Sequence, residues 1–167
     1  MQQLKQHWGR SEALLLLAII LGLLHHIDHV LRFDHSGWPF RPEITPFTFS
    51  LLAYPLLLAA LLWRARPWLR VFCAGFVFIA VQLAHIFLET PAAQFGVWAH
   101  NASEEPYAFH HTNLLNLQSP VLGHVVVVLS ILLSIALLSA TVSLFIDARR
   151  QESPNKAIQR SRCSQHR

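Results

Sequence analysis

The chain has 167 residues, of which 53% are hydrophobic and 13% are charged. Soluble domains carry about 25% charged residues, so this composition argues against an ordinary soluble globular enzyme and leaves no room for a separate soluble domain. A pI near 9.7 does not by itself indicate a nucleic-acid partner, because the basic residues flank long apolar segments. We therefore predict an all-α integral membrane protein, a bundle of four transmembrane helices in contact with the lipid bilayer.

The first predicted span covers about residues 11–31. Its apolar first half resembles the core of a signal peptide, but it leads into His-His-Ile-Asp-His rather than into the small residues that a signal peptidase needs. We therefore expect a retained helix. With 100° of rotation per residue, one face of its outer third carries four ionisable side chains: His25, Asp28, His29 and Arg32.

The second predicted span, about residues 47–63, has Pro55 near its middle. Because proline lacks a backbone N–H, this position predicts a kink in a helix that otherwise looks like scaffold. The third predicted span covers about residues 68–89 and ends before Pro91. Three polar side chains at three- and four-residue spacing lie within about 60° on its outer part: Gln82, His85 and Glu89.

The connection over residues 90–119 is too long for a structureless loop in a compact domain. It is rich in histidine and aromatic residues, so we expect a lid over the outer mouth of the bundle. The fourth predicted span covers about residues 120–146 and begins at a Ser-Pro pair typical of a helix start. Residues 1–147 then form the four-helix transmembrane domain, and residues 148–167 form a basic cytoplasmic tail that we expect to be disordered.

The charges predict the orientation of these helices. Most of the 13 basic residues lie in the amino tail, in the connection between the second and third spans and in the carboxyl tail. These segments share one side if four helices cross in turn, and the positive-inside rule makes that side cytoplasmic. We expect both termini inside and a multi-pass protein of the cell membrane, in a bacterium the inner membrane, with its functional face outside.

Three predicted helices bring imidazoles and carboxylates to the same outer depth. Ionisable side chains are costly there and mark function, and helix bundles build metal centres from such residues at i, i+3 and i+4. We predict a bound transition metal with six candidate ligands: His25, Asp28, His29, His85, Glu89 and His124. Asp28 is either a ligand or an acceptor that orients one. The supplementary candidates are His26, His110 and His111.

The metal and the reaction stay open at this point. Zinc would polarise a carbonyl or activate water as in a hydrolase, whereas iron or copper would support an oxidoreductase, in either case on a lipophilic or interfacial substrate. Two histidines from different helices, such as His29 with His85 or His124, could instead ligate a b-type haem. The chain would then be a non-catalytic haem- or metal-binding subunit that passes its ion or electrons to a membrane partner. The ionisable residues could also form a polar network that only locks the helices together.

Overall fold

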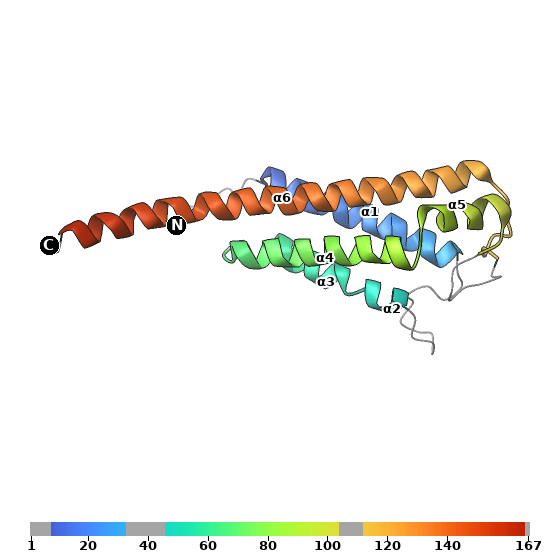
Figure 1. The fold of residues 1–167 in the computed structure, drawn as a ribbon, viewed down its shortest axis with the longest axis horizontal. Coiled ribbons are helices and arrows are strands. Elements are labelled where there is room, and N and C mark those ends of the chain that lie inside the picture. Colours follow the sequence, from blue (N-terminus) through green and yellow to red (C-terminus); the bar gives the residue numbers. More distant parts are fainter. Residues whose placement is uncertain (1–7, 33–45, 104–111, 166–167) are drawn as a thin grey trace.

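The computed structural model describes residues 8–32, 46–103 and 112–165, and all regular structure in these ranges is α-helical (Figure 1). The helices are, in chain order, α1 (Arg10–Arg32), α2 (Pro46–Ser50), α3 (Ala53–Leu62), α4 (Pro67–Phe87), α5 (Pro91–His100) and α6 (Pro120–Gln165). Three helices are long and apolar enough to cross a membrane: α1, α4 and residues 120–152 of α6. Thr48–Leu62 forms a shorter apolar segment. In the described residues the all-helical class is therefore confirmed, and the length and composition of these helices are consistent with a membrane protein.

Helix α6 is the centre of the bundle. Helices α1, α4 and α5 all pack against it, and α3 packs on α4 and α1 (Figure 1). Small residues at the helix contacts, among them Ala18 on α1 and Ala140 on α6, have no exposed surface. In a membrane, small residues of this kind let two helices approach closely. Large apolar side chains cover the outward faces of α1, α4 and α6, as expected for a surface that faces lipid.

The second predicted helix is interrupted close to the proline that predicts a kink. Helix α2 ends at Ser50, Leu51 and Leu52 form a turn, and α3 begins at Ala53. Pro55 therefore lies in the first turn of α3, where its missing N–H has no intrahelical partner to lose. Leu52 keeps helical dihedral angles and the amide of Leu56 donates to its carbonyl oxygen, so Thr48–Leu62 is a short apolar helix with a local distortion.

One end of the bundle is tied together by buried polar contacts. Arg70 of α4 donates to the Glu12 carboxylate of α1 at 2.8 Å and to the carbonyl oxygen of Ala60 on α3 at 2.6 Å. Ser11 of α1 bonds the carboxylate of Asp147 on α6. The start of α1, the α3–α4 turn and the carboxyl-terminal part of α6 therefore lie at the same end.

Helix α6 continues through residues 148–165, where the sequence predicts a disordered tail. The first turn of this extension packs on α4. Trp68 donates from its indole nitrogen to Glu152 at 2.6 Å, and the Arg149 guanidinium lies 5.8 Å from the centre of the Trp68 ring. Residues 148–152 are mostly strong helix formers, so both their helix propensity and the packing on α4 favour continuation of α6.

At the other end of the bundle, the long connection contains a helix and an ordered return. Helix α5 packs on α6, and Asn101 ends it in the left-handed conformation. Asn113 then bonds three backbone groups, and the amide of Leu114 donates to the carbonyl oxygen of Leu31 at the end of α1. Two of the supplementary candidates, His110 and His111, lie outside the described residues.

Gly123 allows α5 to lie close to α6. A β-carbon at Gly123 would stand 3.0 Å from the carbonyl oxygen of Phe95 and 2.7 Å from its ring. We expect Gly123→Ala to lower the free energy of unfolding by about 1–3 kcal/mol, because α5 must move away. Gly96→Ala is the matched control, since a β-carbon there meets nothing within 4 Å and alanine favours a helix by up to ~1 kcal/mol. Thermal unfolding in detergent measures both, and an unchanged Gly123→Ala variant would contradict this account of the α5 contact.

Candidate metal centre

The predicted polar face of α1 is present and buried. His25, Asp28 and His29 are 5–6% exposed and Arg32 is not exposed at all. The helix is uninterrupted from Arg10, so the 3.6-residue period holds up to its last turn and brings these side chains to one side. This side faces α4, α5 and α6, which supply the remaining members of the cluster.

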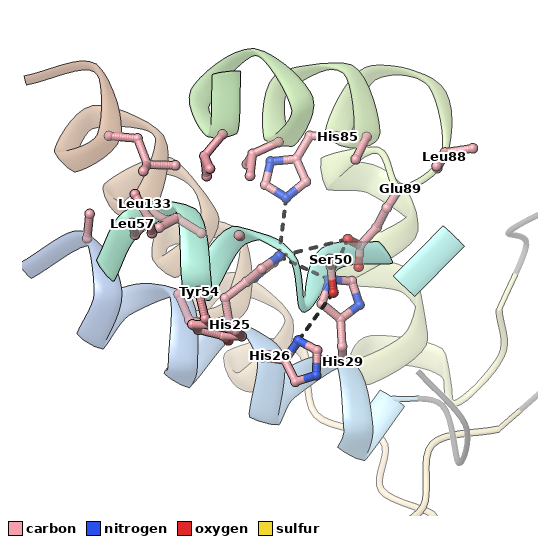
Figure 2. A pocket seen from close by; sticks show the side chains of 17 residues that line it. His25, His26, His29, Ser50, Tyr54, Leu57, His85, Leu88, Glu89 and Leu133 are labelled. Carbon is pink, nitrogen blue, oxygen red and sulfur yellow. Dashed lines mark hydrogen bonds and ion pairs between the residues drawn. The ribbon is translucent and has the colours of Figure 1, made fainter. Parts of the chain in front are cut away.

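Three donor atoms from two segments converge on one point (Figure 2). The Nε2 atoms of His25 and His85 are 3.2 Å apart, and Nε2 of His25 is 4.0 Å from Oε2 of Glu89. In the described part of the chain, these three residues form the group whose ligand atoms all lie within 4.8 Å of one another. Two nitrogens bound to zinc at ~2.0–2.1 Å with a tetrahedral angle are about 3.3 Å apart. The observed spacing therefore fits a bound metal ion.

The contact of His25 with Ser130 leaves a lone pair on Nε2 of the imidazole. Its Nδ1 is 3.3 Å from Oγ of Ser130. The single hydroxyl proton of Ser130 has two acceptors, Oε1 of Gln94 at 2.8 Å and the carbonyl oxygen of Val126 at 3.1 Å. Ser130 therefore accepts from Nδ1–H of His25, and the lone pair lies on Nε2, which contacts Nε2 of His29 at 3.1 Å and Nε2 of His85 at 3.2 Å. A metal-bound histidine is held in the same way by an acceptor at its other nitrogen.

His29 has the opposite tautomer. Its Nδ1 is 3.3 Å from a guanidinium nitrogen of Arg32, and since arginine only donates, this Nδ1 accepts. The proton of a neutral His29 then lies on Nε2, which is 3.1 Å from Oε2 of Glu89. His29 thus donates to Glu89 and orients its carboxylate, whereas the sequence places it among the ligands.

Glu89 lies in the turn between α4 and α5 rather than on the helix itself. Helix α4 ends at Phe87, and the amide of Glu89 still donates to the carbonyl oxygen of Ala84 at 2.9 Å. The side chain is 2% exposed and contacts Arg32 through its other carboxylate oxygen. Arg32 and His29 together fix this carboxylate beside His25.

Asp28 acts on Arg32 and not on the three converging donors. Its Oδ2 accepts from Nε of Arg32 at 2.8 Å, and its Oδ1 accepts from the indole nitrogen of Trp98 at 2.8 Å. Of the two roles open from the sequence, this geometry favours the orienting one.

The charges of the cluster do not balance. Two buried carboxylates, Asp28 and Glu89, share the buried guanidinium of Arg32. With neutral histidines, one negative charge is left in excess among the described side chains of the cluster. A buried charge in a membrane needs a counter-charge, and a bound cation supplies one.

The structure does not bring His124 to this cluster. Its side chain is exposed, its Nδ1 lies 2.7 Å from the carbonyl oxygen of Pro120, and its ring packs on Phe95. His124 and Ser130 are both on α6, but six residues rotate the helix by about 600°, which places them on different faces. A similar depth in the bilayer therefore does not place His124 on the face of α6 that meets the cluster.

His26 lines the cavity beside the cluster without joining the three donors. Its Nδ1 is 3.4 Å from Oγ of Ser50, and its buried Nε2 has no hydrogen-bond partner among the described residues (Figure 2).

Sequence reasoning missed the three residues that complete the cluster: Gln94, Trp98 and Ser130. Gln94 and Trp98 are four residues apart on α5, so their spacing places them on one face if residues 91–100 are predicted to be helical. Ser130 carried no signal, because a small hydroxyl in an apolar helix is common.

The geometry argues against a b-type haem that uses His25 as an axial ligand. Two axial ligands lie on opposite faces of a porphyrin, so their nitrogens cannot be in contact. Nε2 of His25 lies 3.1 Å from that of His29 and 3.2 Å from that of His85. A porphyrin between His29 and His85 would have to displace His25, which contacts both, and His124 packs on Phe95 instead of facing His29.

A comparison with protein-family models, curated proteins and solved structures found no match. The chemistry of the site is therefore inferred from its residues.

Proposed function

We propose that the chain is a multi-pass membrane protein that binds a divalent transition metal ion at one end of its helix bundle and presents it to a lipophilic substrate. The convergence of His25, His85 and Glu89 carries this proposal. Two imidazoles and one carboxylate are a donor set of catalytic zinc sites, which keep a further position open. Iron and copper also accept these donors.

The proposed topology has four spans in alternating directions. Thr48–Leu62 would be about 23 Å long as a helix, somewhat short of a ~30 Å hydrocarbon core. A short span is accommodated by local thinning of the bilayer. The α3–α4 turn lies at the same end as the start of α1, as four crossings require (Figure 1). The basic residues concentrate at that end, so the positive-inside rule makes it cytoplasmic and turns the metal centre outward.

Cysteine accessibility tests this topology. In a variant without the native cysteines, Ala102→Cys at the α5 end should react with a membrane-impermeant maleimide in intact cells. Ala65→Cys in the α3–α4 turn is the matched control and should react only after the membrane is opened, since both alanines are exposed. The reverse pattern would overturn the assignment of the outer face.

The metal content of the purified protein tests the proposed function. We expect close to one zinc, iron or copper per chain by elemental analysis of protein purified in detergent without chelator. An optical spectrum separates the alternatives, since a Soret band would identify haem. Protein without haem or near-stoichiometric transition metal would favour the polar network that locks the helices.

A further inference from the structure

A groove between α3 and α4 continues into the cavity beside the metal centre. The cavity has a volume of about 110 Å³ and is lined by His25, His85 and Glu89 among others (Figure 2). The groove has a volume of about 530 Å³, within the range of small-molecule sites. Six residues line both spaces: Ser50, Ala53, Val77, Val81, Ala84 and Leu88. The two spaces are therefore adjacent, with an apolar groove beside a cavity that has a polar end.

The groove is suited to a hydrocarbon chain. Ser50 is the one polar residue among those that line it. Ala53, Ala80 and Ala84 line it with small side chains, which leave a depression beside the contact between the two helices. Phe76 and Phe87 on its rim are more than half exposed, which places the open side toward the bilayer.

His26, which lines the polar end, has a nitrogen without a hydrogen-bond partner among the described residues. This nitrogen is the buried Nε2, while Nδ1 is taken by Ser50. A buried polar atom without a partner costs free energy, so a ligand that satisfies it gains affinity. A hydroxyl or carboxyl group of a ligand can bond this nitrogen in either tautomer of the imidazole.

The small size of the cavity favours a ligand with a small polar end. Its volume of about 110 Å³ is small beside the 530 Å³ of the groove, so the long apolar part of a ligand lies in the groove. A hydroxyl or carboxyl group is a small oxygen-bearing end that fits the cavity.

We propose that the groove between α3 and α4 binds the chain of a single-chain lipid, whose oxygen-bearing end enters the cavity and bonds His26 beside the metal centre. The lipid reaches this site laterally from the bilayer. This proposal names the class of substrate for the proposed function. It rests on that function only for the metal ion that the polar end of the lipid meets.

Photolabelling of the full chain tests the proposal. The probe is a long-chain fatty acid that carries a diazirine on its chain and a terminal alkyne, added to protein in phosphatidylcholine nanodiscs. We expect saturable labelling that unlabelled fatty acid displaces, with the labelled peptides mapping to α3 and α4. Ala80→Trp should fill the groove and reduce specific labelling at least about tenfold, whereas Ala13→Trp, also at an exposed alanine, should not. His26→Phe should weaken displacement by roughly tenfold, equivalent to about 1.4 kcal/mol.

The outcomes separate this inference from the proposed function. Metal content is measured on the same samples, and Ala80→Trp and His26→Phe should retain their metal. Saturable groove labelling of a metal-free protein would overturn the metal centre but leave the lipid site. Metal-loaded protein that shows no saturable labelling, labelling that Ala80→Trp does not change, or a groove occupied by a second copy of the chain would overturn the lipid site.

Discussion

Replacing any one of the three converging donors should yield protein that is inserted and folded but has lost its metal. The variants are His25→Ala, His85→Ala and Glu89→Gln. Removal of one ligand from a site with three leaves too few donors, so we expect a loss of affinity greater than the ~10–100-fold typical of residues that only orient a ligand. Elemental analysis and metal titration of the purified variants measure this loss.

Two further substitutions separate ligands from orienting residues. His29→Ala and Asp28→Asn should each weaken metal binding by about 10–100-fold, because His29 orients Glu89 and Asp28 orients Arg32. His124→Ala is the control, since its exposed ring contacts Phe95 and not the cluster. If His124→Ala lost its metal as fully as His85→Ala did, the metal would lie elsewhere. Equal binding by all variants would also contradict the assigned ligand set.

The sequence predicts the α1 face of the cluster well. An uninterrupted helix has one period, so the spacing of His25, Asp28, His29 and Arg32 is enough to place them together. His85 and Glu89 are also brought to this face, although Glu89 lies past the end of α4. The turn holds Glu89 at a helix-like position because its amide still bonds Ala84.

The differences come from helix packing, which a local sequence pattern does not contain. The sequence groups His124 with the cluster by its depth in the bilayer, but the rotation of α6 about its axis is set by its packing against α1, α4 and α5. Trp98 reaches Asp28 across 70 positions of the chain, and Ser130 reaches His25 across 105. Such contacts depend on how the helices pack, so the sequence predicts the two helix faces but not the residues that orient them.

Arg32 connects the metal centre to the stability of the whole bundle. Its guanidinium is fully buried between Asp28 and Glu89 and also donates to His29. Arg32→Met would leave two buried carboxylates without their common counter-charge. Breaking a buried ion pair by removing one partner costs about 3–5 kcal/mol. For a chain of this length we expect a fall in Tm of about 10 °C or more in detergent.

The double variant Arg32→Met with Asp28→Asn distinguishes loss of charge balance from loss of packing. The amide of Asn is close in shape to the carboxylate and keeps an oxygen for Trp98, but it carries no charge. We expect it to restore part of the stability that Arg32→Met loses, so the effects of the two changes should not add. Arg150→Met, at an exposed arginine of α6, is the control and should be near neutral. If Arg32→Met unfolded at the temperature of this control, the guanidinium would not hold the two carboxylates in the folded protein, and the buried cluster would need a different source of positive charge.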